Sequence, residues 1–236
     1  MNLILLFKKD FINSKLVQLK KRRFNHIVNV HKALVGDTLN VGIQDGLTGS
    51  GEITYLSDSE LQMKVFFNTE PPSPLPLTLI LAMPRPKVLK RILLNTTSMG
   101  VKKIIILNAY RVEKSFWQSP VLKDENILTQ LILGLEQAKD TVMPKILLRR
   151  LFKPFVEDEL PSLIQNTLPI VAHPGSADQC PHNIKNTVTL VVGPEGGFIP
   201  YEIEKLIECG FTTIHLGQRI LRVETAIPAI ISKLFL

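Results

Sequence analysis

The chain has 236 residues, 45% of them hydrophobic, and a formal net charge of +7 at pH 7. That length can bury one large core or two small ones. It contains no run of 18 apolar residues, and lysines follow the short apolar run at the start rather than precede it. We therefore expect neither a transmembrane helix nor a signal peptide.

The cysteines and histidines give little indication of special chemistry. Cys180 and Cys209 lie far apart without CxxC spacing, and the five histidines show no HxxxH or HExxH spacing. We expect two reduced thiols in a cytoplasmic protein and no metal site.

The first part of the chain is rich in predicted β-strands. Apolar and polar residues alternate over 37–43, 51–56 and 60–67, which predicts strands of a small barrel or curled sheet. Asp45-Gly46 and Gly49–Gly51 are typical of turns, and residues 57–59 predict a hairpin. The segment PPSPLP, residues 71–76, then places four prolines in six residues. Such a segment is an extended linker, so we expect one domain over 1–72 and a second over 73–236.

The second part alternates apolar strands with amphipathic helices. The predicted strands cover 77–83, 101–107, 145–152, 168–173, 188–192 and 212–216. The predicted helices cover 86–99, 119–139, 155–164, 201–209 and 224–235. This alternation predicts an α/β fold with a mostly parallel sheet covered by helices. In such sheets the ligand binds beyond the carboxyl ends of the strands.

Three loops rich in glycine or proline follow predicted strands, over 172–175, 193–197 and 216–222. Glycine lets backbone groups approach a ligand closely, so these loops could hold a small organic molecule. The loop GPEGGF matches neither GxGxxG nor GxxxxGK[ST], and Glu195 would repel a phosphate. The alternative for this loop alone is a tight turn from a strand to a helix.

The segment LGQRILRVETA, residues 216–226, contains two arginines around an apolar pair. Glu224 stands near a predicted helix start, where an acid stabilises the helix dipole. Arg222 has no such structural role, and its guanidinium would suit a phosphate or an electron-rich base.

The basic residues are concentrated in two segments. Residues 1–32 contain eight lysines and arginines and a single acid, Asp10, so this segment carries the whole formal charge. Residues 84–103 form a second basic segment without acids. This distribution favours a nucleic-acid partner, and a solvated charged face is the alternative. The residues that we expect to bind this nucleic acid are Lys20, Lys21, Arg22, Arg23, Lys32, Arg85, Lys87 and Arg91.

LVVGPEGGF (residues 190–198) followed by LGQRILRVETA resembles the two signature motifs of the RsmE family. These SPOUT-class methyltransferases use S-adenosyl-methionine to methylate N3 of a uridine in small-subunit (16S) ribosomal RNA. Further matches are Ala172-His173-Pro174, Glu136-Gln137 with Pro144, and, in the first part of the chain, His26-Ile27 and Gly36-Asp37.

The resemblance implies a trefoil knot at the carboxyl end, a PUA-like RNA-binding barrel before it, and a homodimer that acts on the small ribosomal subunit without a metal. By motif, the cofactor site would comprise His173, Pro174, Gly193, Pro194, Gly197, Leu216, Gly217, Ile220, Leu221 and Thr225. Arg222 would face the RNA near the methyl group.

Uridine N3–H is mostly protonated at neutral pH, so methylation needs a base or stabilisation of the uracil anion. We assign Arg222 to stabilise that anion or grip a flanking phosphate, and Glu224 to act as the base or to orient Arg222. The chain departs from the family pattern at Asn95, Met99 and Asp140. Two alternatives therefore stay open: a non-catalytic RNA-binding assembly factor, and a methyltransferase of another RNA such as tRNA.

Overall fold

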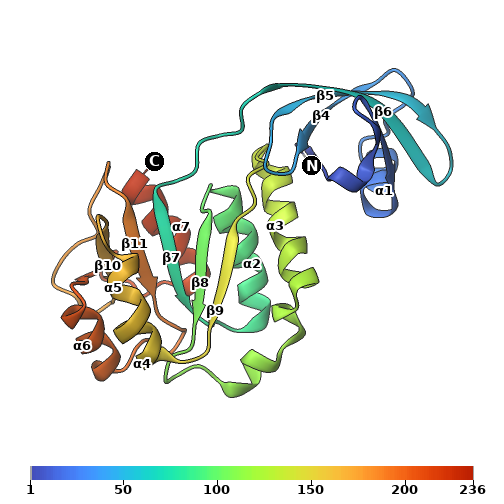
Figure 1. The fold of residues 1–236 in the computed structure, drawn as a ribbon. Coiled ribbons are helices and arrows are strands. Elements are labelled where there is room, and N and C mark those ends of the chain that lie inside the picture. Colours follow the sequence, from blue (N-terminus) through green and yellow to red (C-terminus); the bar gives the residue numbers. More distant parts are fainter. Residues whose placement is uncertain (1, 236) are drawn as a thin grey trace. The chain divides into compact units, whose positions relative to one another are not determined.

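The computed structural model describes residues 2–235, and the chain divides into two compact units (Figure 1). Unit 1 comprises the chain up to Ser73 together with Ile132–Met143, and unit 2 comprises Pro74–Leu131 and the chain from Pro144 onward. Residues 70–75 have no regular secondary structure, as expected where prolines remove backbone donors. Within residues 2–235, no helix combines the length and the apolar character needed to cross a membrane.

Unit 1 is built on a six-stranded sheet in the order β1-β4-β5-β6-β3-β2. The strands are β1 (Ile4–Leu6), β2 (Phe11–Asn13), β3 (Leu16–Lys20), β4 (Thr38–Ile43), β5 (Thr48–Leu56) and β6 (Glu60–Thr69). β1 and β4 are parallel, and the other neighbours are antiparallel. The predicted hairpin at 57–59 is confirmed, because it joins β5 to β6.

Two details of unit 1 differ from expectation. The turn predicted at Gly49–Gly51 is wrong, because these residues lie inside β5. A Cβ at Gly49 would lie 1.9 Å from the carbonyl oxygen of Phe66, so close approach of the neighbouring strand explains this glycine. Helix α1 (Lys21–Asn29) was not predicted. Its buried side chains are Phe24 and Ile27, and a short apolar period is hard to recognise among basic residues.

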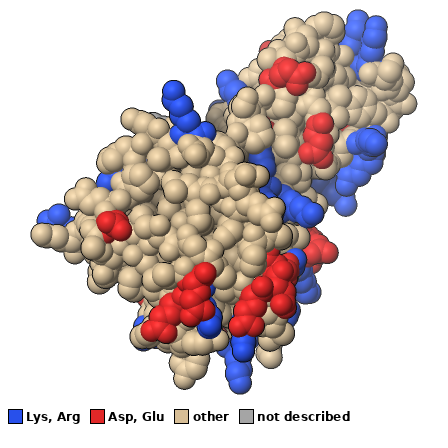
Figure 2. All heavy atoms as spheres, turned by 60° about the vertical axis from the view of Figure 1, so that its left-hand side comes forward, with Lys and Arg blue, Asp and Glu red and all other residues tan. Residues whose placement is uncertain are grey.

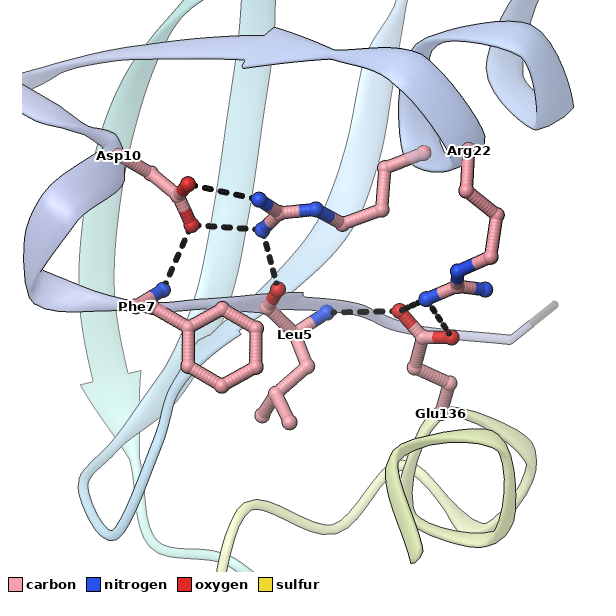
Figure 3. Close-up of polar contacts among 6 residues, drawn as sticks. Leu5, Phe7, Asp10, Arg22 and Glu136 are labelled. Carbon is pink, nitrogen blue, oxygen red and sulfur yellow. Dashed lines mark hydrogen bonds and ion pairs between the residues drawn. The ribbon is translucent and has the colours of Figure 1, made fainter. Parts of the chain in front are cut away.

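Buried carboxylates hold the amino-terminal chain of unit 1 in place (Figure 3). Asp10 accepts two hydrogen bonds of 2.6 Å from Arg23, and its Oδ2 also accepts one of 2.7 Å from the backbone N–H of Phe7. Arg23 in turn donates to the carbonyl oxygen of Leu5 at 2.8 Å. This bidentate pair links α1 to the turn that follows β1.

Glu136 bonds the segment Ile132–Met143 of unit 1 to strand β1 (Figure 3). Its carboxylate lies 3.0 Å from Nη2 of Arg22, and its Oε1 accepts from the backbone N–H of Leu5 at 3.4 Å. Glu136 is 1% exposed. Burial raises the pKa of this carboxyl, and the half-exposed Arg22 offsets only part of that rise. Arg22 and the backbone N–H of Leu5 therefore offset part of the free-energy cost of burying this carboxyl group.

Unit 2 contains a six-stranded sheet in the order β12-β10-β11-β7-β8-β9, in which each neighbouring pair is parallel. The strands are β7 (Leu77–Ala82), β8 (Lys103–Leu107), β9 (Lys145–Arg149), β10 (Leu168–Ala172), β11 (Val188–Val192) and β12 (Thr212–Ile214). β11 is buried along its whole length, which is typical of a parallel strand with both faces covered. The predicted mostly parallel α/β sheet is confirmed.

Helices cover this sheet (Figure 1). They are α2 (Pro86–Ser98), α3 (Asp124–Ala138, its residues from Ile132 onward belonging to unit 1), α4 (Phe152–Pro154), α5 (Leu160–Leu163), α6 (Pro200–Glu208) and α7 (Val223–Phe235), with a π-helical stretch over Phe155–Glu159. Gly100 and Gly210 follow α2 and α6 with positive φ, as expected of helix-ending glycines. The predicted start of α3 is wrong: Ser119 caps a short 3₁₀ turn, Lys123 is extended, and the α-helix begins at Asp124.

Candidate active site

A cavity of about 420 Å³ lies where β10, β11 and β12 end. These three strands are neighbours in the order β12-β10-β11, so the loops that follow them meet at one edge of the sheet. Of the predicted cofactor residues, the cavity is lined by His173, Pro174, Gly193, Pro194, Gly197, Leu216, Gly217, Ile220 and Leu221. The remaining one, Thr225, is exposed in the first turn of α7 and is not a lining residue.

Several lining residues were not predicted from the sequence. They are Val192, Phe198, Ile214, His215, Arg219, Val223, Ala226 and Ile230, with Glu195 and Gly196 from the loop after β11. Ala226 and Ile230 are four residues apart on α7, so they present one face of that helix. This spacing is a signal in the sequence, but it does not reveal which cavity the face meets.

The glycines of the site serve the loops' own geometry. A Cβ at Gly193 would lie 3.1 Å from the ring of Phe198, which packs against this position. Gly197 and Gly217 have φ of +71° and +119°, where side chains are strained. His215 accepts through Nδ1 from the N–H of Gly217 at 2.9 Å, which fixes the start of the third loop. These glycines therefore permit the loop conformations around the cavity and also leave room for a ligand.

The loops after β10 and β12 are bonded to each other. Ser176 Oγ donates to the carbonyl oxygen of Thr213 at 2.8 Å, and the N–H of His215 donates to the carbonyl oxygen of Asp178 at the same distance. The N–H of Cys180 donates to the carbonyl oxygen of His215 at 2.9 Å. Cys180 and Cys209 are both free, and burial raises the pKa of each thiol. Two walls of the cavity thus form one connected structure.

Arg222 and Glu224 occupy different environments at the start of α7. Arg222 lines the cavity, and its carbonyl oxygen accepts from the N–H groups of Thr225 and Ala226. Glu224 accepts instead from Arg91 of α2 at 3.1 Å and does not line the cavity among the described residues. A catalytic base must reach the proton that it removes. Of these two residues, Arg222 lines the cavity, and the side chain of Glu224 is paired with Arg91.

Some of the residues predicted to bind RNA are paired with a carboxylate of unit 1, and the others have exposed side chains. In unit 1, Arg23 is 13% exposed and committed to Asp10, Arg22 pairs with Glu136, and Lys20 pairs with Glu60 at 2.8 Å. Lys21 and Lys32 are exposed. In unit 2, Arg85, Lys87 and Arg91 are exposed along the first half of α2. On the face drawn in Figure 2, the basic side chains are spread over the surface rather than gathered in one patch.

A parallel α/β sheet with a largely apolar pocket built from three strand-end loops defines a protein that binds a small organic ligand at the carboxyl edge of its sheet. Across residues 2–235, no three His, Cys, Asp or Glu side chains are grouped so that they could hold a metal ion.

Comparison with known proteins then specifies the family. Residues 71–235 match the family model described as an RNA methyltransferase domain, so the chain belongs to this family of enzymes. The ribosomal RNA small subunit methyltransferase E of Treponema pallidum is 29% identical, over 96% of this chain and 87% of that protein. The ribosomal RNA small subunit methyltransferase E 1 of Borreliella burgdorferi is 29% identical, over 96% and 94%. The resemblance to RsmE proteins is confirmed.

Solved structures agree on the fold. The ribosomal RNA small subunit methyltransferase E of Neisseria gonorrhoeae, bound to S-adenosyl methionine, superposes with a TM-score of 0.76 at 20% identity. The match covers 98% of this chain and 95% of that one. At 20% sequence identity, this match supports the fold alone.

Proposed function

We propose that the protein transfers a methyl group from S-adenosyl-methionine to N3 of a uridine in 16S ribosomal RNA of the small subunit, in the cytoplasm where that RNA is processed. The observation that carries the proposal is that residues of both sequence motifs, 190–198 and 216–226, line the same cavity. The chain's membership of the RNA methyltransferase family supports the class of reaction. The names of its relatives support 16S ribosomal RNA as the substrate.

The residues of the cavity fit this cofactor. Apolar side chains such as Ile214, Leu221 and Ile230 could pack against an adenine ring, and the exposed backbone of the glycine loops could pair with its polar edge. Glu195 at the cavity disfavours a phosphate ligand but is compatible with the positive charge of a sulfonium. When bound, S-adenosyl-methionine supplies an activated methyl group without a metal.

Arg222 is the substrate-facing residue in this proposal. Its guanidinium stays charged at any physiological pH and can stabilise negative charge on the uracil oxygens as N3 loses its proton. A uridine in folded RNA must be splayed out to reach the cavity, and basic side chains would hold the flanking phosphates. Lys21 and Lys32 of unit 1, and Arg85 and Lys87 of unit 2, are exposed and suited to that task. We leave out Arg22 and Arg23 because both have partners inside unit 1.

The departures from the family pattern do not weaken the cavity. Asn95 and Met99 stand at the end of α2, and neither lines the cavity. Asp140 is 2% exposed and accepts through Oδ1 from the N–H of Val142 at 2.9 Å, so it shapes the chain after α3. These observations favour an active methyltransferase over an assembly factor that has lost its cofactor.

Three finer features belong to the same proposal. The trefoil knot rests on the family resemblance. The loop after β10 is bonded to the end of α7, because the N–H groups of Asn183 and Ile184 donate to the carbonyl oxygens of Lys233 and Leu234 at 3.2 and 2.7 Å. The homodimer rests on the family resemblance. The PUA-like, RNA-binding character of unit 1 rests on the family resemblance and on its exposed lysines.

The test uses labelled S-adenosyl-methionine and small subunits from a strain that lacks the modification. Wild-type protein is expected to label one uridine of 16S RNA. Arg222→Ala is expected to abolish transfer while cofactor affinity, measured by calorimetry, stays within a few-fold. Lys145→Ala, which removes an exposed charge at the start of β9, serves as the control.

Near-normal turnover by Arg222→Ala would contradict the assignment of Arg222. Absence of cofactor binding by the wild-type protein would favour the assembly factor, and labelling of tRNA instead of 16S RNA would favour the other methyltransferase.

A further inference from the structure

The loop after β11 carries an acid, Glu195, that the proposed reaction does not use. Glu195 Oε1 accepts a hydrogen bond of 3.0 Å from the backbone N–H of Arg85, which is 110 positions away in the sequence. Arg85 is the N-cap residue of α2, in the loop after β7. β7 is the neighbour of β11 on the side away from β10. The bond therefore joins the cofactor loop to a strand end that contributes no lining residue.

A second contact comes from the loop after β8. Nη1 of Arg111 donates to the carbonyl oxygen of Gly196. A Cβ at Gly196 would lie 3.2 Å from Cδ of Arg111, so the absence of a side chain lets the arginine stem lie against the loop. Arg111 thus holds the residue next to Glu195 from the outside of the cavity.

A third contact fixes the far end of the same segment. Glu202 in the first turn of α6 is 3% exposed, and its two oxygens accept from different backbone groups. Oε1 accepts from the N–H of Tyr110 at 2.7 Å, and Oε2 accepts from the N–H of Ile199 at 3.0 Å. The loop after β8 is therefore bonded to the segment both before and after Phe198.

We propose that Glu195 is a positioning residue, which together with Arg111 and Glu202 clamps the segment 193–199 against the loops after β7 and β8. The clamp leaves the cavity side of Gly193 and Gly197 free to meet the ligand. Holding a binding loop in its bound shape beforehand lowers the entropy lost on binding. Glu195 would then contribute to cofactor affinity through the loop, without touching the reacting atoms. This inference rests on the proposed function for the identity of the ligand.

The partner of Glu195 is a backbone N–H, which allows a matched pair of variants at each end of the bond. Glu195→Ala removes the acceptor, and Glu195→Gln keeps an oxygen in its place. Arg85→Pro removes the donor, and Arg85→Ala keeps it while removing the guanidinium. Proline suits this position, because Arg85 has φ of −51°.

Cofactor affinity is measured by calorimetry without RNA, so that loss of an RNA contact at Arg85 does not change the measured affinity. We expect Glu195→Ala and Arg85→Pro each to weaken S-adenosyl-methionine binding by about three- to tenfold, since the bond is charge-assisted but exposed. The double variant should bind no more weakly than the weaker single variant. Arg85→Ala should stay within about twofold of wild type, and Glu195→Gln, which keeps an acceptor but loses its charge, should bind more tightly than Glu195→Ala. At saturating cofactor, kcat of Glu195→Ala should be nearly unchanged, with the loss confined to KM.

Hydrogen exchange of residues 193–199 in the ligand-free protein provides an independent measurement. Exchange should be faster in Glu195→Ala and Arg85→Pro, unchanged in Arg85→Ala, and less affected in Glu195→Gln than in Glu195→Ala. Unchanged exchange and affinity in Arg85→Pro would overturn the clamp, as would equal damage by Glu195→Gln and Glu195→Ala. A wild-type chain that binds no cofactor would overturn the proposed function instead, and the exchange rates would still decide the clamp.

Discussion

Arg23→Ala tests whether this arginine serves the fold of unit 1 rather than RNA binding. The substitution leaves Asp10, which is 7% exposed, to the backbone N–H of Phe7, and it also removes the donor to the carbonyl oxygen of Leu5. Removing one member of a buried ion pair costs about 3–5 kcal/mol, because the remaining charge stays desolvated. Since whole domains are stable by about 5–15 kcal/mol, this is a large fraction of what holds unit 1 together.

Native-state hydrogen exchange can measure this loss in unit 1 separately from unit 2. A loss of about 3–5 kcal/mol corresponds to exchange roughly a hundred- to several-thousand-fold faster. We expect this acceleration in β1 and β3, while β7 and β11 of unit 2 act as an internal reference. Lys64→Ala, which removes an exposed charge from β6, is the matched control and should change exchange very little.

The double variant Asp10→Ala/Arg23→Ala sharpens the test. If the two side chains form one buried unit, the double variant should cost clearly less than the sum of the single variants. A loss below about 1 kcal/mol in Arg23→Ala, or strict additivity, would refute the buried-pair reasoning. Arg23 would then again be a candidate for RNA binding.

Two further predictions concern unit 1. The raised pKa of Glu136 means that the folded state binds this proton more tightly than the unfolded state. The group's contribution to stability is therefore largest below its ordinary value of 4.5 and is lost as the pH rises through the folded pKa. The unfolding free energy of Glu136→Gln should accordingly gain on that of the wild type as the pH rises above 4.5, and a constant difference in denaturant titrations would contradict this. Gly49→Ala should destabilise unit 1 by about 2–4 kcal/mol, because its Cβ would meet a backbone oxygen, whereas Gly46→Ala, whose Cβ would have ordinary contacts from 3.5 Å, should be near neutral in the same titrations.

Sequence patterns were most informative where structure is local. The continuous apolar strands of unit 2 and the glycines that end α2 and α6 follow from periodicity and backbone preference. α1 escaped prediction because two buried residues in nine give too weak a period. Gly49 was mistaken for a turn residue because a glycine demanded by a neighbouring strand looks the same in sequence as one demanded by a turn.

For the site, the loops that line the cavity could be recognised from the sequence, because Gly and Pro must be encoded where the backbone turns sharply at a strand end. The tertiary structure decided how those loops are held and which charges are free. Glu195 binds the N–H of Arg85, Glu224 binds Arg91, and Arg23 binds Asp10, each across a separation that no local pattern encodes. A charged side chain has no periodicity of its own, so its partner, and hence its role, is set only when the strand order brings distant segments together.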